Sequence, residues 1–175
     1  MPLPFPFKVT NCQFRYDAIE DRIALDCHPL SSVSLTLYLT RRLVERLLND
    51  LAGVLAKSSS VARRAPHSLR SEVVLMEHDG AVSAAHASVA VPIAAASGPA
   101  AQHAYLVTSV KLRVLPSSFT VTLQSKTQDL VYFEAIRDDM HRFLDLLKRA
   151  GLVAGWAIHI EVSWLSTTPT ALRIN

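Results

Sequence analysis

The feature that most constrains the fold of this chain is a succession of three β-strands and one helix that occurs twice. In the first copy, apolar and polar residues alternate over three segments, 7–16, 22–28 and 33–39. The apolar phase of the first segment changes near Thr10 and Asn11, which predicts a β-bulge. A helix with one apolar face follows, and we expect it to begin after the cap residue Thr40 and to end near Lys57.

The second copy repeats this order of elements. Strands are predicted over 103–114, 119–124 and 129–136. The helix after them is expected to be capped by Asp138 or Asp139 and to end at Gly151. Residues 9–15 align with 107–113, 23–25 with 121–123, and 44–51 with 140–147, with one short gap in a turn. This agreement favours an internal duplication; because strand patterns recur often, two similar meanders by coincidence are the alternative.

A three-stranded antiparallel meander has one apolar face, which one amphipathic helix can cover. The predicted fold class is therefore α+β, with two similar β-β-β-α units related by a pseudo-twofold axis in a layered structure of sheet and helices. An extra C-terminal strand is expected over 156–164, where one face carries Ile158, Ile160, Val162 and Trp164.

Two segments between the copies are less regular. Residues 68–79 fit a helix slightly better, because Ser68 can cap it, but the repeat favours a strand over 72–77. Gly80 is expected to end either element. Residues 81–102 have the Ala, Ser and Pro composition of a linker. The expected organisation is a first unit with one further element, a linker and a second unit with the terminal strand, over 1–80, 81–102 and 103–175, and all three form one compact domain.

The composition limits the class of protein. Half of the residues are hydrophobic and 19% are charged, which excludes a wholly disordered chain. No apolar run is long enough to span a membrane, and the first residues lack the pattern of a secretory signal. We therefore expect a cytoplasmic protein without a membrane partner. Cys12 and Cys27 fall on neighbouring predicted strands and are expected to be free and buried, with a disulfide as the alternative.

The formal net charge of +3 is too small to indicate a nucleic-acid partner without a concentrated basic stripe. The basic residues are densest within 41–70. An anionic partner would be bound there by Arg41, Arg42, Arg46, Arg63 and Arg64. A solvated helix face followed by an ordinary loop explains the same residues.

The densest polar cluster comprises Glu77, His78 and Asp79. A metal-binding or acid–base role needs a further ligand, and His86 is the nearest histidine. The simpler interpretation is that these residues form the polar end of an element.

Two other sets of polar residues are weaker candidates. His141 would share a face with Glu134 and Asp138 only if the second helix began early. His159 and Glu161 lie on the polar face of the last predicted strand, where exposure to solvent is the simpler explanation.

The chain has no glycine-rich phosphate loop, nucleophile elbow or zinc-protease motif, so we assign no catalytic residue, cofactor or metal. The sequence favours a non-catalytic protein-binding or assembly module that contacts another protein or a second copy of itself. The alternatives are a small enzyme or ligand-binding protein with a site between the two halves, and a protein that binds an anionic partner.

Overall fold

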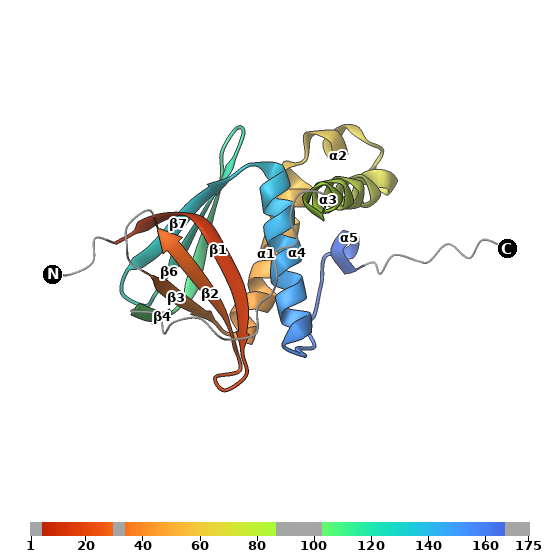
Figure 1. Cartoon of the computed structure of the whole chain (residues 1–175). Coiled ribbons are helices and arrows are strands. Elements are labelled where there is room, and N and C mark those ends of the chain that lie inside the picture. The colour runs from red at the N-terminus through yellow and green to blue at the C-terminus, as the bar shows by residue number, and fades with distance from the viewer. Residues whose placement is uncertain (1–4, 30–33, 87–102, 167–175) are drawn as a thin grey trace.

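The computed structural model describes residues 5–29, 34–86 and 103–166. Within these residues the chain is α+β, with seven strands in one mixed sheet and five α-helices to one side of it (Figure 1). The described helices include none that is both long and apolar enough to cross a membrane.

The strands are β1 (Phe7–Asp17), β2 (Arg22–Pro29), β3 (Leu35–Leu39), β4 (His103–Leu106), β5 (Ser109–Val114), β6 (Phe119–Gln124) and β7 (Asp129–Ala135). Their order across the sheet is β4-β3-β2-β1-β7-β6-β5. The pairs β1–β7 and β3–β4 are parallel, and all other neighbours are antiparallel.

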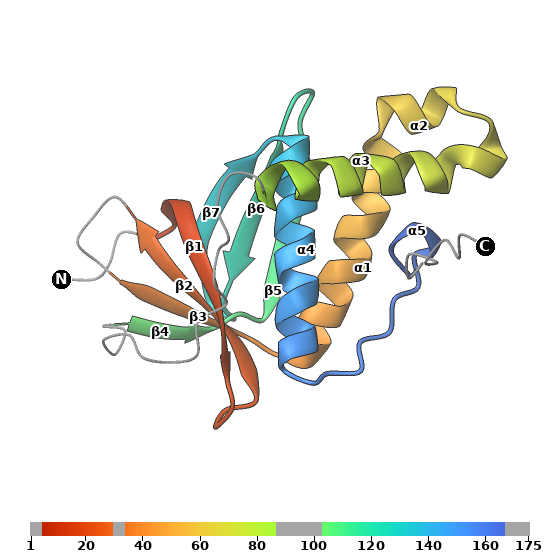
Figure 2. The same ribbon diagram turned by 45° about the vertical axis from the view of Figure 1, so that its right-hand side comes forward.

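The helices are α1 (Arg41–Ser58), α2 (Ser60–Arg64), α3 (Arg70–His86), α4 (Arg137–Val153) and α5 (Ser163–Ser166), with a 3-10 turn at His67–Leu69. Helices α1 and α4 lie side by side between the sheet and α3, which crosses both of them (Figure 2). The short helix α5 lies beneath α3.

The first meander and its helix agree closely with the prediction. Strand β2 pairs antiparallel with both β1 and β3. The register of β1 on β2 shifts between Val9 and Cys12, which confirms the expected bulge. Thr40 caps α1, because its hydroxyl oxygen accepts a hydrogen bond of 3.3 Å from the N–H of Leu43.

The core lies between the sheet and the pair α1–α4. Seven residues of α1 are buried: Leu43, Val44, Leu47, Leu48, Leu51, Ala52 and Leu55. From α4 the buried residues are Met140, His141, Leu144, Leu147, Ala150 and Gly151. Burial of one leucine side chain stabilises the fold by about 1.5–3 kcal/mol, so these two helical faces hold the molecule together.

The two β-β-β-α units lie next to each other in the sheet, so that the first strand of one unit pairs with the third strand of the other. The first strand predicted for the second unit contributes β4, which in turn pairs with the third strand of the first unit. These reciprocal pairs do not by themselves confirm the pseudo-twofold relation or the duplication.

Residues 103–114, predicted as one strand, form two. Strand β4 pairs with β3 at one end of the sheet and β5 pairs with β6 at the other. The two residues between them join these ends, since Val107 N–H donates to Tyr38 O and Thr108 N–H donates to Gln124 O. The sheet thus curls so that the end of β4 lies next to the start of β5. A pattern of apolar residues cannot indicate where a strand changes partner.

The segment around 72–77 is helical, so the alternative strand was wrong. Helix α3 also continues through Gly80 to His86 instead of ending. A single glycine costs a helix about 1 kcal/mol relative to alanine, which its neighbours can offset. The rest of the predicted linker, 87–102, lies outside the described residues.

Two other predicted boundaries were wrong. Helix α4 begins at Arg137, ahead of the expected aspartate caps, and its cap residue Ile136 makes no side-chain hydrogen bond. Gly151 lies inside α4, where a Cβ would collide with the side chain of Ile158. The last predicted strand, 156–164, is not part of the sheet: it is an extended segment followed by α5.

Candidate functional site

Two of the candidate histidines come together although they are far apart in the sequence. His78 of α3 faces His141 of α4, and their Nδ1 atoms are 3.3 Å apart. Both side chains are buried, His141 completely. One Nδ1–H must therefore donate a hydrogen bond to the other Nδ1. The two rings are consequently in different tautomers, one protonated on Nδ1 and the other on Nε2.

Burial lowers the pKa of His141 to about 3, and the positive charge of Arg137 and the neighbouring His78 act in the same direction. Burial also lowers the pKa of His78. Both imidazoles are consequently neutral near pH 7. Among the described residues, the Nε2 atom of His141 has no hydrogen-bond partner, and Glu77 Oε2 lies 3.9 Å from it.

The carboxylate of Glu77 is held by other residues, because each of its two oxygen atoms accepts a hydrogen bond from a different side chain. Arg137 donates to Glu77 Oε2 from Nη2 at 2.7 Å and from Nε at 3.1 Å. Ser59 Oγ donates to Glu77 Oε1 at 2.8 Å. Arg137 also donates to Leu55 O and Ser58 Oγ at the end of α1. This network joins α1, α3 and α4 at one point.

The indole of Trp164 in α5 closes the cluster. Its ring centroid lies 5.4 Å from that of His78 and 6.0 Å from that of His141. Its N–H donates to Ala52 O at 3.1 Å. The side chain is 2% exposed, so it shields the imidazole pair from solvent.

The contacts of this cluster join the helices α1, α3, α4 and α5 to one another. No group of three or more His, Cys, Asp or Glu side chains in the described residues is placed to hold a metal ion. Glu134, which the sequence grouped with His141, belongs to β7 and pairs with Lys8 at 3.8 Å. Asp79 is exposed, and the side chain of His86 lies outside the described residues.

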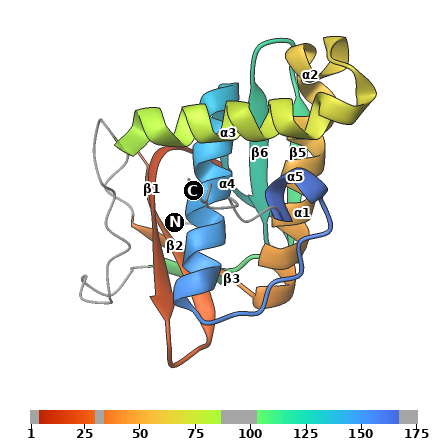
Figure 3. The same ribbon diagram turned by 90° about the vertical axis from the view of Figure 1, so that its right-hand side faces the viewer.

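His159 and Glu161 lie in the extended segment 156–162, which we call the strap, and their side chains are exposed. The strap runs along α1 toward α5 (Figure 3). Its backbone bonds to helix side chains: Asn49 Nδ2 donates to His159 O at 2.9 Å, and Glu161 N–H donates to Asn49 Oδ1 at 2.8 Å. The two residues are therefore held away from the histidine pair.

The five arginines do not form one patch. Arg41 donates to Ala157 O of the strap at 2.8 Å. Arg42 and Arg46 are exposed on the first half of α1, whereas Arg63 and Arg64 are exposed in α2, beyond its other end. A helix as long as α1 separates its ends by about 27 Å.

The two cysteines are free. They are directly opposite each other on β1 and β2, and their sulfur atoms are 3.3 Å apart. The neighbouring Cys12 and burial raise the pKa of Cys27, so its thiol is protonated near pH 7.

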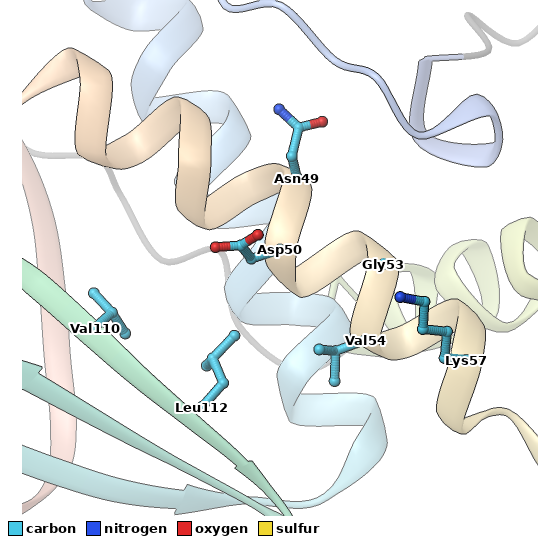
Figure 4. A pocket seen from close by; sticks show the side chains of 7 residues that line it. All are labelled: Asn49, Asp50, Gly53, Val54, Lys57, Val110 and Leu112. Atoms are coloured by element: carbon cyan, nitrogen blue, oxygen red, sulfur yellow. The ribbon is translucent and has the colours of Figure 1, made fainter.

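One surface feature was missed by the sequence analysis. A hollow of about 420 Å³ lies between α1 and β5, lined by Asn49, Asp50, Gly53, Val54, Lys57, Val110 and Leu112 (Figure 4). The only local signal was Gly53 in the middle of an otherwise strongly amphipathic helix.

Comparison of the chain with protein-family models, with curated proteins and with solved structures gave no match.

Proposed function

We propose that this chain is a non-catalytic protein-binding module and that the free edge of β5 is its contact surface. The observation that carries the proposal is that β5 ends the sheet and has no strand on its outer side among the described residues. The polar candidates, in contrast, bond to other parts of the same chain: Glu77 to Arg137, and the two histidines to each other.

The hydrogen-bonding pattern of β5 supports this role. Leu115 N–H donates to Ser118 O, and the β5–β6 register has no shift from there to Ser109. Because bonded and non-bonded pairs alternate in an antiparallel ladder, the N–H and C=O groups of Val110 and Leu112 face outward. Exposed groups of this kind pair readily with an extended segment of another chain.

The proposal is tested with Leu112→Pro in the full chain. Proline removes an N–H that faces outward, so the β5–β6 ladder remains, whereas Leu112→Val keeps the N–H and is the control. We expect self-association or a co-purifying protein with the wild type and the control, and loss of it with Leu112→Pro. Protein that is monomeric by light scattering and has no co-purifying partner would contradict the proposal.

We also propose that the two β-β-β-α units are copies of one ancestral unit. The aligned positions have similar surroundings: Ile23 and Leu25 in one unit, and Val121 and Leu123 in the other, are fully buried. The parallel pairs β1–β7 and β3–β4 each join the first strand of one unit to the third strand of the other, which is the arrangement expected if a pseudo-twofold axis relates the two copies. A profile built from related sequences should align the two halves better than shuffled sequences; an alignment no better than chance would refute the duplication.

A further inference from the structure

The hollow lies beside the outer edge of β5, where the side chains of a strand added to that edge could be buried. Val110 and Leu112 line it from the sheet, and their outward-facing backbone groups are the ones that a guest strand would bind. Gly53 and Val54 line it from α1 (Figure 4). A guest strand bound to this edge would direct every second side chain into the hollow.

Gly53 is not required by the described part of the fold. A Cβ built at this position meets no atom within 4 Å, and its backbone has no positive φ. Glycine nevertheless destabilises a helix interior relative to alanine, so the position keeps open a space that nothing in the described residues fills. Gly80 in α3 is equally open, but it lies outside the residues that line the hollow.

The charges on β5 indicate what kind of strand would bind. Lys111 and Arg113 are exposed and alternate with Val110 and Leu112, so they lie on the opposite face of the strand, where Lys111 also pairs with Asp129 at 3.6 Å. A second copy of β5 paired antiparallel about Leu112 would bring Lys111 opposite Arg113, and like charges directly opposite are destabilising. Acidic residues at these positions would be attracted instead.

We propose that β5 and the hollow together bind an extended segment of another protein in which small apolar residues alternate with acidic residues. The apolar side chains enter the hollow over Gly53 and Val54, and the acidic ones face Lys111 and Arg113. This inference rests on the proposed function and adds to it the binding mode and the chemistry of the partner.

The test uses a fluorescent peptide matched to the six residues of β5, with valine and glutamate alternating, and a second peptide with lysine in place of glutamate. Fluorescence anisotropy should show binding of the glutamate peptide alone to the full chain. Gly53→Leu should weaken it about tenfold or more, because its side chain fills the hollow. Gly80→Leu is the matched control and should bind as the wild type does. Arg113→Glu should weaken the glutamate peptide and favour the lysine peptide.

Other outcomes would overturn the inference. If neither peptide binds, Lys111 and Arg113 serve only to keep the edge free of unwanted strands. If a peptide binds Gly53→Leu and the wild type equally, the hollow is not involved. If the peptide-free protein is a dimer that Leu112→Pro dissociates, the occupant is a second copy. A co-purifying protein that Leu112→Pro releases and Gly53→Leu retains would overturn the inference while the proposed function stands.

Discussion

The contacts of the two buried imidazoles determine which nitrogen atom of each ring carries the proton. If His78 donates its Nδ1 proton, His141 carries its own proton on Nε2, which then points toward Glu77 Oε2 at 3.9 Å. The opposite arrangement would place the Nε2 lone pair of His141 near the carboxylate, which is unfavourable. The first arrangement also explains how a nitrogen without a hydrogen-bond partner is tolerated in the core, because the carboxylate attracts its N–H.

This geometry predicts a loss of stability in mild acid. The pKa of His141 is about 3 in the folded protein and about 6.5 in an unfolded chain. The unfolded chain therefore binds the proton first, and stability falls as the pH falls from about 6.5 toward 3, by up to about 1.4 kcal/mol per pH unit. His141→Phe, which cannot titrate, should make the free energy of unfolding depend less steeply on pH in urea titrations between pH 7 and pH 4.5.

The exposed His67 supplies the control for this measurement. His67→Gln should keep the pH dependence of the wild type, because this exposed side chain lies outside the buried imidazole pair. Equal slopes for the wild type and His141→Phe would mean that the buried pair does not cause the acid sensitivity.

Among the elements, the strap is the one whose sequence was most misleading. Its alternation is real, since Ile158, Ile160 and Val162 are partly buried against the core and the residues between them are exposed. However, its backbone bonds to side chains of α1 instead of a neighbouring strand. Alternation indicates an extended chain with one buried face. It cannot indicate which groups form hydrogen bonds with the backbone N–H and C=O groups.

The strap and α1 fit because their spacings match. Arg41, Glu45 and Asn49 recur every four residues, which is about 6 Å along a helix. Their partners Ala157, His159 and Glu161 recur every two residues, which is about 6.6 Å along an extended chain. One row of polar helix side chains can therefore bind successive peptide groups of the strap.

Asn49 is the central residue of this row, and its loss should loosen the strap. Asn49→Ala removes one donor and one acceptor to the strap, and each hydrogen bond contributes about 0.5–1.5 kcal/mol. We expect a loss of about 1–3 kcal/mol in the free energy of unfolding and faster amide hydrogen exchange at Glu161. Arg46→Ala, on the exposed side of the same helix, should change neither quantity appreciably. Unchanged exchange at Glu161 in Asn49→Ala would contradict this role.

Most strands and helices were predictable because each buries one regular face. The strands of both meanders and the apolar faces of α1 and α4 could be identified by their periods. The candidate site was only partly predictable: Glu77 and His78 were selected as one cluster and His141 separately, and only the crossing of α3 over α4 brings them together. The hollow was not predictable, because it depends on where the curled sheet leaves β5 relative to α1.

Across the whole molecule, the attachment of α3 differs from that of the other long helices. Its buried residues are Val74, His78 and Ala81, with no side-chain burial described for its last two residues. Helix α1, in contrast, buries seven residues, all of them aliphatic. Helix α3 therefore depends on the imidazole pair, the Glu77–Arg137 ion pair and the indole of Trp164, and polar contacts contribute less net stability than burial of aliphatic side chains.

We consequently expect α3 to open before the sheet unfolds. In native-state hydrogen exchange at low urea, the amides of α3 should exchange with a lower free energy of opening than those of β2, whose residues Ile23 and Leu25 are fully buried. Trp164→Phe, which loses the hydrogen bond to Ala52 O, should lower the value for α3 more than that for β2. Equal opening energies for α3 and β2 would show instead that helices and sheet unfold as one cooperative unit. In that case the polar junction would be as strong as the aliphatic core, because separation of α3 would cost as much as unfolding the whole domain.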